Sequence, residues 1–105
     1  MSDSYNKSLS LANDLYLKGN FEKASKAYKI LVDKGFKDSI LFANFAVTQH
    51  QLGRVENAIE FYRKSIQIEP HNSHIHLMLA YALKAIGNFI EAKLAVDSSI
   101  ELDPS

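Results

Sequence analysis

The chain has 105 residues, of which 47% are hydrophobic, and this length suits one domain. Twelve basic side chains balance twelve acidic ones, so we expect no nucleic-acid partner, which would need clustered Lys and Arg along its phosphates. Cysteine is absent, which excludes disulfides and thiol chemistry, and no stretch approaches the roughly 18 apolar residues of a membrane span.

In chain order, the apolar spacing predicts three pairs of helices. Leu11, Ala12 and Leu15 recur at helical intervals in the first helix, and Phe21 and Tyr28 continue this spacing in the second. The six helices are expected over residues 4–18, 21–34, 38–52, 55–68, 72–86 and 89–102. Capping residues precede two of them: Asp38 or Ser39 before the third helix, and Asn72 or Ser73 before the fifth.

Gly19, Gly53 and Gly87 separate the two helices of each pair and recur at intervals of 34 residues. Each stands where a helix must stop and the chain reverse, a place that favours positive φ and hence glycine. Two alanine columns keep the same period, namely Ala12, Ala46 and Ala80, and Ala24, Ala58 and Ala92. The chain is therefore expected to be one domain, residues 1–105, with repeats over about 5–38, 39–72 and 73–105.

These columns resemble the tetratricopeptide repeat, whose period is 34 residues and whose pattern pairs a leucine–small column with a later alanine. The helix-packing column reads Leu11, Phe45 and Leu79 in this chain, and the last two repeats close with Pro70 and Pro104. The resemblance implies an all-α, right-handed superhelical solenoid of three helix-turn-helix repeats and six helices. It also implies a protein–protein interaction module that binds a peptide or protein segment in a concave groove.

The resemblance places the first helix of each repeat along this groove. The predicted groove residues are Asn13, Tyr16, Ile40, Asn44, Val47, His50, His74, Leu77, Met78, Tyr81 and Lys84. Asn13 and Asn44 are expected to hydrogen-bond the backbone of the bound peptide, and Leu77, Met78 and Tyr81 to act as apolar anchors.

Relatives that hold the C-terminal carboxylates of chaperones use cationic side chains in these columns. The corresponding positions here carry Leu9, His74 and Met78, so we expect no carboxylate clamp.

The residues that could carry chemistry predict neither catalysis nor a bound metal or cofactor. His74 and His76 point about 200° apart around a helix, so with His71 they do not converge as a metal site requires. Glu60 has Lys64 one helical turn onward, the spacing of an exposed ion pair. We therefore expect no enzyme. The start of the chain has no apolar leader, so a cytoplasmic location is expected.

The last predicted helix carries Leu94, Val96, Ile100 and Leu102 with no further helix to cover them. Repeat arrays need a polar terminal face, so we expect the natural chain to continue past Ser105, or this helix to pair with a second copy in a homodimer. The alternative function is that of an N-terminal portion of a larger protein, which could be an enzyme, where the array positions substrate or mediates self-association.

Overall fold

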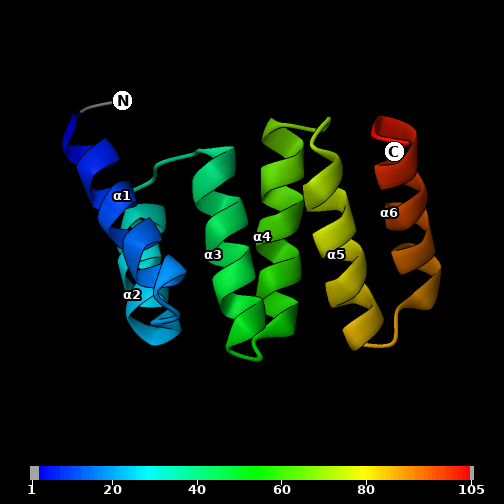
Figure 1. Cartoon of the computed structure of the whole chain (residues 1–105), viewed down its shortest axis with the longest axis horizontal. Helices are drawn as coiled ribbons and strands as arrows, with labels where there is room; N and C mark the ends of the chain where they lie inside the picture. The colour runs from blue at the N-terminus through cyan, green and yellow to red at the C-terminus, as the bar shows by residue number, and fades with distance from the viewer. Residues whose placement is uncertain (1–2, 105) are drawn as a thin grey trace.

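The computed structural model describes residues 3–104, which form six α-helices. They are α1 (Asp3–Leu17), α2 (Phe21–Asp33), α3 (Ser39–Gln51), α4 (Val55–Ile68), α5 (Ser73–Ala85) and α6 (Phe89–Leu102). The helices stand in a row and succeed one another antiparallel along the array (Figure 1). The fold is thus the predicted all-α repeat solenoid, and each helix begins and ends within one residue of its predicted bounds. None of the helices in this part of the chain is long and apolar enough to cross a membrane.

The turn at Gly53 shows why glycine recurs between the paired helices. Its φ is +81°, a left-handed conformation that costs an L-residue with a side chain about 1–2 kcal/mol. The turn is closed by two backbone hydrogen bonds, from Gly53 N–H to the His50 carbonyl at 3.0 Å and from Arg54 N–H to the Gln49 carbonyl at 2.8 Å. These bonds satisfy carbonyls that the end of α3 would otherwise leave unpaired.

Side-chain caps fix where α3 and α5 begin. The Asp38 carboxylate accepts from Ile40 N–H at 3.1 Å, and the Asn72 amide oxygen accepts from His74 N–H at 3.1 Å. Asp38 and Asn72 are therefore the N-caps, and the serine after each is the first helical residue. Each cap supplies an acceptor to the free N–H groups of the first turn, a contribution of about 1 kcal/mol.

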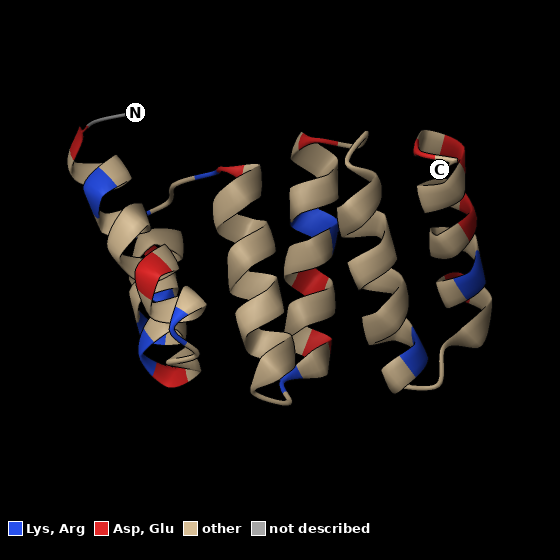
Figure 2. Cartoon of the chain, in the orientation of Figure 1, with Lys and Arg blue, Asp and Glu red and all other residues tan. Residues whose placement is uncertain are grey.

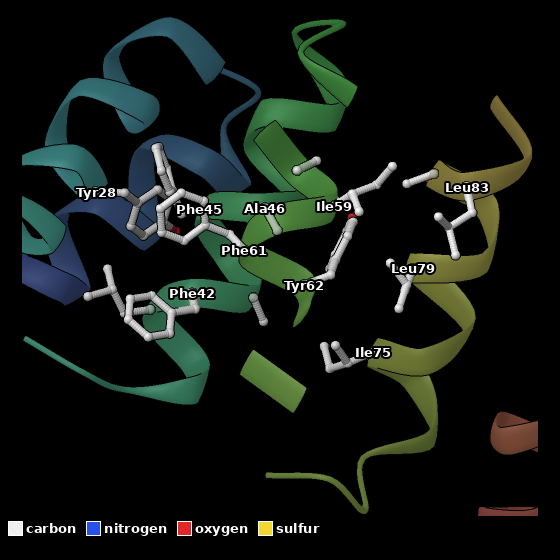
Figure 3. Packing of buried hydrophobic residues seen from close by; sticks show 14 of the residues in the cluster. Tyr28, Phe42, Phe45, Ala46, Ile59, Phe61, Tyr62, Ile75, Leu79 and Leu83 are labelled. Atoms are coloured by element: carbon white, nitrogen blue, oxygen red, sulfur yellow. The ribbon is translucent and has the colours of Figure 1, made fainter. Parts of the chain in front are cut away.

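The core runs through the array as a continuous layer between successive helices. The alanine columns are buried throughout, which lets neighbouring helices approach closely. The first junction between repeats is filled by aromatic rings: Phe45 and Phe61 meet edge to face with centroids 4.8 Å apart, and Phe42 lies 5.7 Å from Phe61. Figure 3 shows these rings beside Tyr28 of α2, with Phe45 between α2 and α4.

The first helices of the pairs lie closer to one another than the second helices do. Within residues 3–104, backbone positions of α1 approach α3, and those of α3 approach α5, to within 8 Å, whereas α2 and α4, and α4 and α6, have no such approach. This difference defines an inner side, formed by α1, α3 and α5, and an outer side, formed by α2, α4 and α6.

The prediction that Leu11 packs between helices is wrong. Its side chain is 61% exposed, although Phe45 and Leu79 at the same position of the next repeats are buried. This position packs against the preceding helix pair, as the contact between Phe45 and Tyr28 of α2 shows with a centroid distance of 6.4 Å. No helix precedes α1 in the described part of the chain, so Leu11 has nothing to pack against.

Candidate functional site

The predicted groove residues all lie on α1, α3 and α5, the helices of the inner side. They recur at spacings of three and four, which places them on one face of each helix. On α5, Leu77 and Tyr81 each lie about 160° around the axis from the buried Leu79; Tyr81 is exposed, whereas Leu77 is half-buried. Ile40 and Tyr81 are 56% and 53% exposed, and His74 and Lys84 are also exposed.

An amide cluster joins α1, α2 and α3 on this side. The Asn13 side-chain oxygen accepts two hydrogen bonds, from the Tyr28 hydroxyl at 2.6 Å and from Asn44 Nδ2 at 2.9 Å. Burial raises the pKa of Tyr28 above its usual range, so the phenol stays protonated and donates. Asn13 Nδ2 and Asn44 Oδ1 form no hydrogen bond with the rest of residues 3–104. The cluster therefore presents one amide nitrogen and one amide oxygen that are free to donate and to accept.

A small hollow of about 140 Å³ opens beside this cluster, between α3 and α5. Ile40, Ala43 and Asn44 of α3 line one wall, and Ile75 of α5 lines the other. The predicted residues Ile40 and Asn44 thus share one surface feature, with an apolar and a polar contribution.

Val47 and Met78 are less accessible than the sequence predicts. Both are half-buried and pack against the core rather than standing clear of it. The inner helices approach one another closely, so a side chain between them is partly covered by the next helix. Tyr16 is half-buried too, with its ring 5.8 Å from that of Phe21, and His50 is half-buried in the last turn of α3.

The inner side is almost free of formal charge over two of its three helices. The residues of α3 include no Lys, Arg, Asp or Glu, and those of α5 include only Lys84. Figure 2 shows α3 and α5 almost wholly uncoloured, while α2, α4 and α6 carry charges of both signs. Any partner that lies along α3 and α5 therefore meets apolar and neutral polar groups.

The histidines near the start of α5 do not converge. A ring nitrogen of His76 lies 2.8 Å from the Pro70 carbonyl, whereas His74 is exposed at the first turn of α5. Within residues 3–104, no three His, Asp or Glu side chains come together in a way that could hold a metal ion.

Sequence reasoning missed the buried hydroxyl of Tyr62 on α4. Tyr62 occupies the same repeat position as Tyr28, but its hydroxyl is buried and has no hydrogen-bond partner in the described residues. The residue that corresponds to Asn13 in this repeat is Val47, which offers no acceptor. Comparing the two repeats position by position could have predicted the unpartnered Tyr62 hydroxyl, because Val47 stands where the other repeat has Asn13.

Comparisons with known proteins agree with this architecture. The tetratricopeptide repeat profile matches residues 49–105, more than half of the chain. Small glutamine-rich tetratricopeptide repeat-containing protein 2 of Mycosarcoma maydis is 27% identical in an alignment of 104 residues, which covers 92% of this chain and 30% of that protein. The chain thus spans less than a third of this curated relative.

Solved structures share the fold at low sequence identity. The Yersinia enterocolitica type III secretion chaperone SycD, in complex with a peptide of the translocator YopD, matches with a TM-score of 0.91 and 24% identity, covering 98% of this chain and 79% of its own. The second tetratricopeptide domain of Spaghetti, bound to an HSP90 peptide, matches with a TM-score of 0.86 and 20% identity, covering 93% and 85%.

Proposed function

This chain belongs to the tetratricopeptide repeat family, and on that basis we propose that it binds a segment of another protein along the inner side of α1, α3 and α5. The segment is held by hydrogen bonds from the amide cluster and by apolar contacts with α5. SycD and the Spaghetti domain, which share the fold, are each bound to a peptide of another protein, and this supports a peptide as the ligand.

The proposal rests on two side-chain atoms that form no hydrogen bond within the described residues, Asn13 Nδ2 and Asn44 Oδ1. A peptide group offers one carbonyl acceptor and one N–H donor, and Asn13 Nδ2 and Asn44 Oδ1 supply the complementary donor and acceptor. The Asn13 oxygen already accepts hydrogen bonds from Asn44 Nδ2 and from the Tyr28 hydroxyl, so both amides are held in place before a ligand arrives. Such preorganisation lowers the entropy cost of binding.

The apolar contacts come from α5, where Tyr81 is exposed and Leu77 and Met78 are half-buried. Tyrosine is a favourable anchor because it buries a large ring at a small cost in conformational entropy. The lack of charge on α3 suits a segment with apolar and neutral side chains. The positions of a carboxylate clamp carry Leu9, His74 and Met78, so an acidic C-terminus is not the expected ligand.

The test is selection of binding peptides from a random peptide library displayed on phage, followed by calorimetry with the peptides that bind. In the double variant Asn44→Ala with Tyr81→Ala, we expect these peptides to bind at least about tenfold more weakly, the equivalent of about 1.4 kcal/mol. Helicity should be unchanged, because neither side chain belongs to the buried core.

The matched control is Lys93→Ala with Glu60→Ala, two exposed side chains of the outer helices. This control should bind the selected peptides as the unmodified chain does. Equal affinity of the two double variants for every selected peptide would contradict the proposal.

We also propose that α6 mediates self-association. Phe89 and Ile100 are 63% and 55% exposed, while the residues at the same positions of the earlier repeats are at least half-buried. Two copies that meet through this face across a two-fold axis would cover it in a closed dimer.

A further inference from the structure

The outer side carries a second surface feature, a hollow of about 400 Å³ between α4 and α6 with α5 as its floor. We call it the outer hollow; its apolar walls are formed by Ile66, Leu79, Leu83, Leu94 and Ala95. Its size and apolar lining are those of a small ligand site, in which a few polar groups set the orientation.

The repeat itself explains why the outer hollow exists. The equivalent space between α2 and α4 is filled by three phenylalanine rings, Phe42, Phe45 and Phe61 (Figure 3). One repeat later, the same three positions carry the smaller side chains of His76, Leu79 and Ala95. The loss of the ring at the Phe61 position is the largest of these changes, since alanine leaves only a methyl group there.

Polar side chains from all three helices also line the outer hollow, namely Arg63, Gln67, His76, Glu91 and Ser98. Arg63 of α4 and Glu91 of α6 form an ion pair at 2.7 Å that spans the gap between the two helices, and both line the outer hollow. Both side chains are about half exposed, so the pair holds the rim only weakly. A guanidinium group at this place favours an aromatic occupant over an aliphatic one, because it interacts with the face of a ring.

We propose that the outer hollow binds an aromatic side chain, a phenylalanine ring, of a partner polypeptide. The ring takes the place that Phe61 fills in the first junction, with Leu79 and Leu83 beneath it, Leu94 and Ile66 at its sides and Arg63 at its rim. This site is distinct from the inner side, since Leu79 lies about 160° around α5 from Leu77 and Tyr81. A partner can therefore occupy it whether or not a peptide is bound on the inner side.

The test is a titration of the 105-residue chain with N-acetyl-phenylalaninamide, followed by methyl-labelled NMR of its isoleucine and leucine residues. We expect saturable shifts, with half-saturation on the order of millimolar, at the methyl groups of Ile66, Leu79, Leu83 and Leu94. N-acetyl-alaninamide, which lacks the ring, should shift none of these signals. Absence of shifts at these methyls, or equal shifts with both compounds, would overturn the proposal.

A second experiment repeats the titration with variants whose larger side chains fill the outer hollow. Ala95→Phe places a ring at the position equivalent to Phe61, so it should abolish the shifts and raise the melting temperature. If Ala95→Phe does not fold, Leu79→Phe replaces it in the test, because it places a ring at the position equivalent to Phe45. The matched control is Ala85→Phe, which adds a ring at an exposed position outside the hollow and should keep the shifts. The variant with Asn44→Ala and Tyr81→Ala should keep them as well. Shifts that persist in a folded Ala95→Phe or Leu79→Phe chain would refute the site.

Discussion

At the residue scale, Tyr28 and Tyr62 form a natural comparison. The two rings occupy equivalent positions on α2 and α4 and are both fully buried, but only the Tyr28 hydroxyl has a partner, Asn13. A buried hydroxyl without a hydrogen bond costs free energy, because it has lost its bonds to water without replacement.

We therefore predict opposite effects when each hydroxyl is removed. Tyr62→Phe should raise the free energy of unfolding by about 1 kcal/mol, whereas Tyr28→Phe should lower it by about 1 kcal/mol and leave the Asn13 oxygen with only the hydrogen bond from Asn44. Urea denaturation of the two variants and the unmodified chain measures both changes. A loss of stability in Tyr62→Phe would mean that its hydroxyl has a stabilising partner after all.

The buried tyrosines also predict how stability depends on alkaline pH. Burial raises the pKa of Tyr5, Tyr28 and Tyr62 in the folded chain, and the hydrogen bond to Asp38 raises that of Tyr5 further. In the unfolded chain these phenols ionise near pH 10, so the folded state retains protons that the unfolded state releases. These protonated phenols therefore contribute their full share to the free energy of unfolding below about pH 10. The free energy of unfolding falls as the pH rises further, by about 1 kcal/mol per pH unit for each tyrosine.

Urea denaturation between pH 8 and 11 tests this expectation. The double variant Tyr28→Phe with Tyr62→Phe has fewer buried phenols and should lose stability less steeply above pH 10. Identical slopes for the double variant and the unmodified chain would show that Tyr28 and Tyr62 do not cause the alkaline loss.

At the scale of the helix, burial depends on which neighbours a helix has. Leu11 and Phe45 share one repeat position on α1 and α3, but only α3 follows an earlier helix pair in residues 3–104. Phe45→Ala should lower the free energy of unfolding by about 3–5 kcal/mol, because it leaves a cavity against Tyr28 and Phe61.

Leu11→Ala serves as the matched control at the same repeat position and should change stability by less than about 0.5 kcal/mol, because its side chain is exposed. Thermal denaturation with circular dichroism detection compares the two. Similar losses in both variants would show that Leu11 is covered in solution.

This contrast also shows what the sequence could and could not predict. The helix bounds and turns depend on local signals, the apolar spacing and the glycines, and these predictions are confirmed. The exposure of Leu11 could not be predicted, because whether this position is buried depends on a helix outside its own repeat. Gln49 is buried because Ser25 and Asn57 satisfy its amide at 2.6 and 2.7 Å, a match between three helices that no single pattern reveals.

The inner side and the outer hollow also differ in how much of each could be predicted from the sequence. The repeat register placed Asn13 and Asn44 on one side, but their mutual hydrogen bond required the distance between α1 and α3. The outer hollow results from side-chain volumes at three positions on different helices, so it becomes visible only when α4, α5 and α6 are placed together. The roles proposed for the inner side and for the outer hollow remain predictions.

At the scale of the whole molecule, we predict that the chain dimerises through α6. Sedimentation equilibrium from micromolar to millimolar protein should show a monomer–dimer equilibrium, because Phe89 and Ile100 leave an apolar end face. Ile100→Glu should shift the chain to monomer, since two carboxylates would be brought together at the two-fold axis.

The control is Leu11→Glu, which places the same charge on an exposed position at the opposite end of the array. In a two-fold dimer through α6 this variant should still associate, whereas a head-to-tail filament would lose its contacts in both variants. A monomer throughout the range for the unmodified chain would exclude self-association through α6.

The wider spacing of the outer helices has a mechanical consequence. Because no backbone positions of α2, α4 and α6 lie within 8 Å of one another, and α4 and α6 are joined across their gap by the side chains of Arg63 and Glu91, the array can bend about its closely spaced inner helices. Bending that opens the outer side widens the gap between α4 and α6, and bending the other way narrows it. The curvature of the inner side and the width of the outer hollow therefore change together. A ligand that pushes α4 away from α6 would change the shape of the inner side, where we propose that a peptide binds.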